Sequence, residues 1–84
     1  PQADGRVNAL AAVDDVVYVG GEFTTLGSAA RNRVAAVGTD GSLRNFNPDA
    51  NGAVYALTIA DSDVLVGGDF TTIGGQARSR LAVV

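Results

Sequence analysis

A nine-residue phrase occurs twice in this 84-residue chain, and the duplication restricts the fold more than any other feature. The segment VGGEFTTLG at residues 19–27 returns 47 residues later as VGGDFTTIG at residues 66–74. With the same offset, residues 1–37 align with residues 48–84 without a gap, and 20 of these 37 positions are identical. Self-similarity at a fixed period is typical of a repeat architecture, in which neighbouring units bury a face against each other.

Each repeat is predicted to be a series of short strands separated by tight turns. Asp-Gly and Asn-Gly pairs precede the first strand of each copy, and both pairs favour turns because their residues tolerate positive φ. A nine-residue loop, TTLGSAARN, separates the second and third strands of the first copy. Pro48 ends the fourth strand, since it lacks a backbone donor. The expected strands are Val7–Val13, Val16–Phe23, Arg33–Gly38 and Ser42–Asn47 in the first copy, and Val54–Ala60 and Val64–Phe70 at the start of the second.

Alternation along the strands indicates which positions share a face, because neighbouring side chains of a strand point to opposite sides. One face of the second and of the third predicted strand is identical in the two copies, whereas the opposite face varies, as where Tyr18 becomes Leu65. The repeated face therefore meets the same surroundings twice. Its members are Val17, Val19, Gly21 and Phe23 in the second strand, and Arg31, Arg33, Ala35 and Val37 in the third.

Four short strands in a 47-residue unit predict an all-β fold built from β-propeller blades. Solenoid coils usually have shorter periods, and a trefoil requires three units in one chain. Residues 1–47 form the first predicted blade and residues 48–84 the second, which lacks its outer strand and has three. The phrase recurs, on this interpretation, because each blade stacks on another like itself. The expected partners are accordingly other blades, in a homo-oligomer or in the rest of a parent chain.

The composition narrows the function classes. Cysteine and histidine are absent, which excludes zinc held by those residues and the usual nucleophile–base pairs. The net charge is −3 and the six arginines are scattered, which argues against nucleic-acid binding. No apolar run approaches the ~18 residues of a membrane span. We therefore expect no catalysis, no cofactor, no metal and no membrane insertion.

Two glycine pairs superficially resemble part of a phosphate-binding loop. Such a loop needs a helix after the strand, whereas Phe23 and Phe70 continue the predicted strands here. Close approach of backbone between packed sheets explains the glycines better. The pairs are Gly20-Gly21 and Gly67-Gly68.

The repeated arginines admit two interpretations. Guanidinium groups could bind a sugar acid or a phosphorylated ligand. Alternatively, each ties the long loop to a carboxylate or carbonyl, with Glu22 and Asp69 as acidic partners, and recurrence in both copies favours this structural role. The residues concerned are Arg31, Arg33, Arg78 and Arg80.

The remaining polar residues give weaker signals. Asp14, Asp15, Asp61 and Asp63 occupy equivalent turns, but no calcium-loop pattern surrounds them, so turn formation is the better explanation. Thr24-Thr25 and Thr71-Thr72 have no evident base and are expected to cap the strand end and bond to loop backbone.

The segments VGGDFTTIGGQARSRLAVV and DGSLRNFNPDANGAVYAL together resemble the delta-60 repeats, a bacterial β-propeller family, and look similar to the fungal cortical-marker propellers. The resemblance covers residues 19–37, 40–57 and 66–84; Ser28 departs from it, replacing the second glycine of the I-G-G motif. It implies a propeller scaffold or binding module that is extracellular or on the cell surface. The expected function is a non-catalytic scaffold and protein-interaction module. The alternatives are a carbohydrate- or ligand-binding propeller of a cell-surface protein, and the non-catalytic propeller domain of a larger enzyme.

Overall fold

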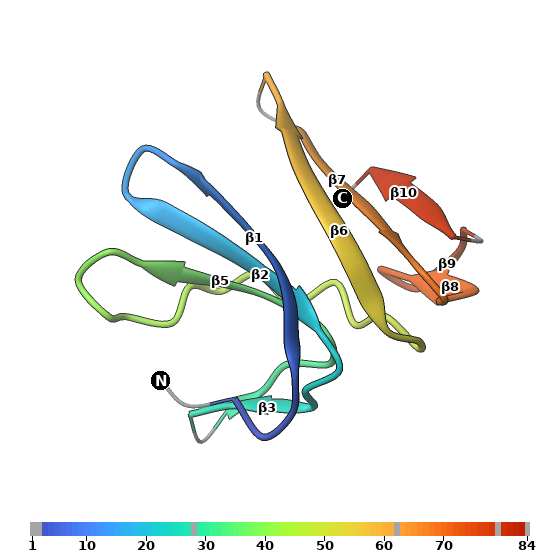
Figure 1. Cartoon of the computed structure of the whole chain (residues 1–84), viewed down its shortest axis with the longest axis horizontal. Helices are drawn as coiled ribbons and strands as arrows, with labels where there is room; N and C mark the ends of the chain where they lie inside the picture. The colour runs from blue at the N-terminus through green and yellow to red at the C-terminus, as the bar shows by residue number, and fades with distance from the viewer. Residues whose placement is uncertain (1–2, 28, 62, 79, 84) are drawn as a thin grey trace.

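Two three-stranded antiparallel sheets, one from each repeat, lie side by side (Figure 1). The computed structural model describes residues 3–27, 29–61, 63–78 and 80–83, and all regular elements in that part of the chain are strands. The predicted all-β class is therefore confirmed. In the first sheet β2 (Val16–Gly21) lies between β1 (Val7–Val13) and β5 (Val34–Gly38). In the second sheet β7 (Asp63–Gly68) lies between β6 (Val54–Ala60) and β10 (Leu81–Val83).

The two sheets share the same irregularity. The register of β1 on β2 shifts between Val7 and Ala9, and that of β6 on β7 shifts between Val54 and Ala56. At this bulge the neighbouring backbone comes so close that a Cβ on Gly21 would collide with the carbonyl oxygen of Arg6. The equivalent Gly68 faces the carbonyl oxygen of Ala53 in the same way. The second glycine of each repeated pair is thus required by the bulge inside its own sheet.

Each long loop between the second and third strands folds into a small hairpin, which the sequence pattern did not predict. In the first repeat β3 (Thr25–Leu26) pairs with β4 (Ala29–Ala30). In the second repeat β8 (Thr72–Ile73) pairs with β9 (Gln76–Ala77). The turns use Gly27 and Gly74, both at a φ of 63°. Two-residue strands are too short to produce a detectable alternation.

The predicted fourth strand, Ser42–Asn47, is wrong. Only Leu43 forms an isolated bridge, to Val37, flanked by the bond from the Arg44 amide to the Ala36 carbonyl at 2.8 Å. Beyond Arg44 the chain leaves the sheet edge and crosses toward the second repeat. Phe46 then packs edge-to-face on Tyr18 at 5.2 Å between ring centroids, a contact that a continued strand would not provide.

Several predicted strand ends also differ from the structure. β2 and β7 end at Gly21 and Gly68, two residues before the phenylalanines that were expected to end them. β5 begins at Val34 because Arg33 adopts a φ of 69°, which is incompatible with a regular strand. Arg33 therefore does not continue the face of Ala35 and Val37. Arg80 has the same φ, so the departure is repeated in the second copy.

The buried core consists of two clusters. One lies within the first repeat and contains Val19, Phe23, Leu26 and Ala35. The other is built on the second repeat, around Phe70, but it includes Val34 of the first. Both phenylalanines of the repeated phrase are fully buried, as the alternation predicts. The shared cluster shows that the sheets pack on each other, in the manner of neighbouring blades.

Candidate functional site

The best-defined candidate site is the contact between the two repeats. Gly20 and Tyr18, on one face of β2, meet β6 of the second repeat. A Cβ built on Gly20 would lie 2.5 Å from Cγ1 of Val54 and 3.3 Å from Cγ of Leu57. Leu57 and Ile59 pack on the shared cluster beside Val34. The first glycine of the phrase therefore serves the contact between sheets, as the sequence suggested, while the second serves its own sheet.

Hydrogen bonds reinforce this contact around the segment that enters the second repeat. Arg33 Nη1 donates to the carbonyl oxygen of Ala50 at 3.1 Å. The amide of Ala50 donates to the carbonyl oxygen of Asn32 at 3.2 Å, and Asn32 Nδ2 donates to Asp49 Oδ1 at 2.8 Å. Farther along, Asn8 Nδ2 donates to the carbonyl oxygen of Val54 at 3.0 Å. Asn8 and Asn32 were not among the residues singled out from the sequence, because neither is repeated.

The repeated arginines bond to carbonyl or amide oxygens rather than to the acids expected for them. Arg31 donates to the carbonyl oxygens of Ala30 at 2.8 Å and Arg44 at 3.3 Å. Arg78 donates to the carbonyl oxygen of Ala77 at 2.9 Å and to Gln76 Oε1 at 3.2 Å. Within the described residues the ion pair is Arg44 with Asp15, at 3.4 Å. The expected pairing with Glu22 and Asp69 is therefore wrong.

Those two carboxylates have other donors. Glu22 accepts a bond from Asn8 Nδ2 at 3.3 Å. Asp69 accepts one from the Tyr55 hydroxyl at 3.1 Å. That bond, together with the negative charge of Asp69, raises the pKa of Tyr55 above its ordinary value. Each acid thus accepts a hydrogen bond from a side chain on the first strand of its own sheet, β1 for Glu22 and β6 for Asp69.

Equivalent residues of the two repeats differ sharply in exposure. Val34 is fully buried, whereas its equivalent Leu81 is 63% exposed. Ala36 is 1% exposed and its equivalent Val83 60%. Conversely, Val54 is fully buried against the first repeat, and its equivalent Val7 is 42% exposed. Each repeat has two packing faces, and the chain covers only one face of each.

A side-chain clamp fixes the entrance of each repeat. Asp4 Oδ1 accepts bonds from the amides of Thr24 at 2.7 Å and Thr25 at 2.9 Å, and Asp4 Oδ2 accepts the Thr24 hydroxyl at 2.7 Å. These bonds, with that of the Thr25 amide the strongest, lower the pKa of Asp4 to about 2. The threonine hydroxyl thus bonds to a side chain rather than to loop backbone.

The second repeat forms the same clamp with a neutral residue. Asn51 Oδ1 accepts the amides of Thr71 at 2.7 Å and Thr72 at 3.0 Å, and Asn51 Nδ2 donates to the Thr71 hydroxyl at 2.9 Å. The signal was present in the sequence, because both Asp4-Gly5 and Asn51-Gly52 precede a Thr-Thr pair by the same interval.

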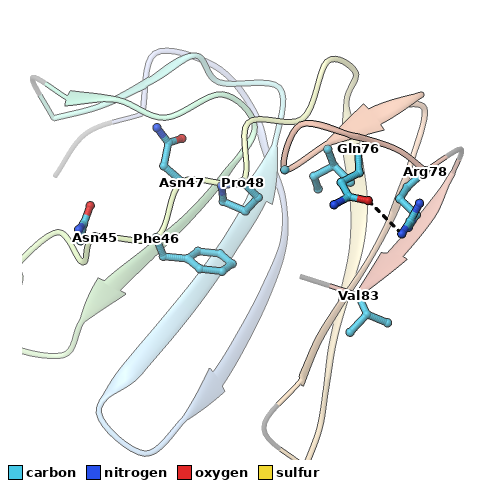
Figure 2. A pocket seen from close by; sticks show the side chains of 9 residues that line it. Asn45, Phe46, Asn47, Pro48, Gln76, Arg78 and Val83 are labelled. Atoms are coloured by element: carbon cyan, nitrogen blue, oxygen red, sulfur yellow. Dashed lines mark hydrogen bonds between the residues drawn. The ribbon is translucent and has the colours of Figure 1, made fainter.

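A cleft of about 460 Å³ lies between residues 45–48, which connect the two sheets, and the strands β8, β9 and β10 of the second repeat (Figure 2). Phe46 and Pro48 line one wall, and Val83 lies on the other. Its polar groups are the amides of Asn45, Asn47 and Gln76 and the guanidinium of Arg78, which is already bonded to Gln76. Of the arginines considered for ligand binding, only Arg78 lines this cleft.

The geometry of the described residues gives no support to phosphate binding by the glycine pairs or to a metal site. The glycine pairs lie within β2 and β7, and no helix follows them in the described residues. No cluster of three or more His, Cys, Asp or Glu side chains in that part of the chain is placed to hold a metal ion. Over the same residues, no helix is long and apolar enough to cross a membrane.

Comparison with known proteins finds a family match over part of the second repeat. Residues 60–82 match a family described as a domain of unknown function (DUF5122) beta-propeller. The matched segment runs through all of β7, the β8–β9 hairpin and most of β10. No curated protein and no solved structure matches the chain. The family match and the two packed all-β repeats together support a β-propeller repeat.

Proposed function

We propose that this chain is a non-catalytic β-propeller segment whose function is to dock other blades, as a scaffold and protein-interaction module. The single observation that carries the proposal is the pair Val34 and Leu81. These residues occupy the same place in their repeats, yet one is fully buried and the other 63% exposed. The surface that the second repeat buries on the first repeat is exposed on the second repeat, where it is available to an equivalent neighbour.

The finer family assignment belongs to this proposal. Similarity to the delta-60 repeats and to the fungal cortical-marker propellers rests on the V-G-G-x-F-T and R-x-R-L-A segments, and the phenylalanine of the first segment is buried in both repeats. An extracellular or cell-surface location accompanies that resemblance. The absence of cysteine from the sequence is compatible with such a location, because the buried phenylalanines and the contact between repeats supply the core.

The decisive experiment is the mass of the particle in solution as a function of concentration, measured by light scattering after gel filtration. We expect association at micromolar concentration, with the far-UV circular dichroism of a β protein. A chain that unfolds cooperatively and stays monomeric throughout that range would overturn the docking function.

A second candidate, binding of a small polar ligand, is favoured by the cleft beside Phe46. Three amide side chains, one guanidinium and an aromatic ring are the groups that recognise sugars and sugar acids. The test is a glycan array with the Arg78→Ala variant, with Arg31→Ala as the matched control. Glycan binding that Arg78→Ala abolishes, with the melting temperature unchanged, would establish this function in place of docking.

A further inference from the structure

The two uncovered faces of the molecule belong to opposite sides of the blade pair. The open face of repeat 2 consists of Leu65, Gly67, Leu81 and Val83, which are joined by the β7–β10 pairing. Their equivalents are Tyr18, Gly20, Val34 and Ala36, which form the face of the first repeat that the second covers. The open face of repeat 1 consists of the exposed Val7, Leu10 and Ala12 on β1, with the half-buried Val17 of β2 beside them. Their equivalents, Val54, Leu57, Ile59 and Val64, are the residues that do the covering.

We propose that these two faces bind each other between copies, so that the open face of repeat 1 in one copy docks head-to-tail on the open face of repeat 2 in another. The inference rests on the proposed docking function and names its partner as a second copy of this chain. The contact between the repeats within the chain provides the template. Three of the four covering residues are unchanged, because Val7, Leu10 and Val17 match Val54, Leu57 and Val64.

Side-chain size differs between the template contact and the proposed one. Leu81 and Val83 on the open face are larger than Val34 and Ala36, by one and two carbons respectively, but Leu65 is smaller than Tyr18 by three carbons and an oxygen. On the facing surface Ala12 is three carbons smaller than Ile59. Unfilled space in a packed contact weakens it. We therefore expect the contact between copies to be weaker than the contact within the chain.

The backbone of the second face leaves room for this partner. At Gly20 a Cβ would strike Val54, whereas at Gly67 the nearest atoms to such a Cβ, in Ala56 and Arg80, are 3.8 Å away. The space beside Gly67 has the position that Val54 fills beside Gly20. In the head-to-tail contact it receives Val7 of the second copy.

A polar contact follows from the same equivalence. Arg33 donates across the repeats to the carbonyl oxygen of Ala50, and the equivalents of these two residues are Arg80 and Ala3. Arg80 is exposed and shares the φ of Arg33, so its backbone is already in the conformation of the bonded copy. In the head-to-tail contact its guanidinium meets the carbonyl oxygen of Ala3 in the second copy. The apolar residues supply the buried area of the contact, and this bond fixes its orientation.

Engineered cysteines test the orientation cleanly, because the chain contains none. Two full-length single variants, Gly67→Cys and Val7→Cys, are mixed and oxidised, and the disulfides are mapped by mass spectrometry. The built Cβ of Gly20 lies 3.3 Å from Cβ of Val54, near the short limit of the ~3.5–4.5 Å of a disulfide. We expect the mixed disulfide in preference to either homodimer. The Gly20→Cys/Val54→Cys double variant is the intrachain control.

A charge on the open face provides an independent measurement. Leu81→Asp should weaken association at least about tenfold, because a carboxylate would be desolvated without a partner. Thr39→Asp, in the exposed turn of the first repeat, adds the same charge away from both faces and should leave association unchanged.

The outcomes separate the two proposals. A folded chain that remains monomeric at all concentrations overturns the docking function itself. Association without the mixed disulfide, or association that Leu81→Asp leaves intact, overturns the head-to-tail contact while the docking function stands.

Discussion

Gly20 lies directly against Val54, so that a single added methyl group on the first repeat would enter the van der Waals space of the second. Gly67, its equivalent, has no atom closer than 3.8 Å to such a group. Neither glycine has a positive φ, so alanine is sterically allowed by the backbone at both positions. The pair therefore separates the effect of packing from that of conformational entropy.

We expect Gly20→Ala to lower the free energy of unfolding by about 1–3 kcal/mol through overpacking. Gly67→Ala should leave it unchanged or raise it by up to about 1 kcal/mol, because glycine is unfavourable within a strand. Urea titration of both variants below the concentration of association measures the difference. Equal losses at the two positions would contradict the contact between repeats.

The buried phenylalanines provide a test of the core. Phe23→Ala and Phe70→Ala should each cost about 3–5 kcal/mol, because both side chains are fully enclosed. Leu10→Ala, at a position that is 65% exposed, is the apolar control and should change the free energy of unfolding by about 0.5 kcal/mol or less. Losses under about 1 kcal/mol for the phenylalanines would contradict the burial of the repeated phrase.

The arginine that bridges the repeats should matter more than its equivalent. Arg33→Ala removes the bond to the Ala50 carbonyl and should cost about 1.5–3 kcal/mol. Arg80 has the same φ of 69° as Arg33 but is exposed, so alanine has the same effect on the backbone at both positions. The loss of stability in Arg80→Ala should therefore stay at about 0.5 kcal/mol. Thermal unfolding of the two variants at low concentration compares them. A larger loss at Arg80 would show that the bond across the repeats contributes little.

The clamp at Asp4 makes a specific contribution to the pH dependence of stability. Its pKa in the folded chain is about 2, below the ordinary value of 3.8. A lowered pKa means that the stabilisation is fully present above pH ~4, declines as the carboxylate is protonated, and is lost near pH ~2. Because Asp40 also has a lowered pKa, the wild-type chain must be compared with a variant.

Asp4→Asn is that variant, since Asn51 already forms the same clamp in the second repeat. We expect its stability at neutral pH to be close to that of the wild type, and the decline between pH ~4 and pH ~2 to be shallower. Asp4→Ala should lose stability at both pH values. Chemical denaturation across this range measures the slopes. Parallel slopes for wild type and Asp4→Asn would rule out the clamp as their source.

The sequence correctly predicted the strands that show a clear alternation of side chains. The predictions were wrong where a single tertiary contact or a single backbone angle determines the structure. β1 and β6 have the predicted bounds, because seven-residue strands next to Asp-Gly or Asn-Gly turns give clear signals. The segment after Ser42 was predicted to be a strand, but only Leu43 bridges to the sheet edge, and Phe46 packs on the ring of Tyr18 instead. Arg33 and Arg80 follow the alternation in sequence and break it in conformation, because a positive φ leaves no mark in the spacing of apolar residues.

The sequence predicted only part of the candidate site. The repeated glycines pointed to close packing between sheets, and Gly20 does lie there, whereas Gly67 faces open space and Gly21 and Gly68 pack within their own sheets. Which face remains uncovered was not deducible, since Val34 and Leu81 are both apolar residues in the same pattern. That difference arises from neighbours in space. Likewise, Asn8 and Asn32 bond across the repeats at positions where the two copies differ, so the search for repetition passed over them.

The constant offset of 47 residues has a consequence for symmetry. A contact between two different surfaces is heterologous, so a pair of molecules joined by it always retains one unused surface of each kind. Such a series ends only when the last copy meets the first, and otherwise it grows as a filament. In the proposed head-to-tail contact, repeats 1 and 2 therefore alternate along the whole series, and every repeat faces the same direction.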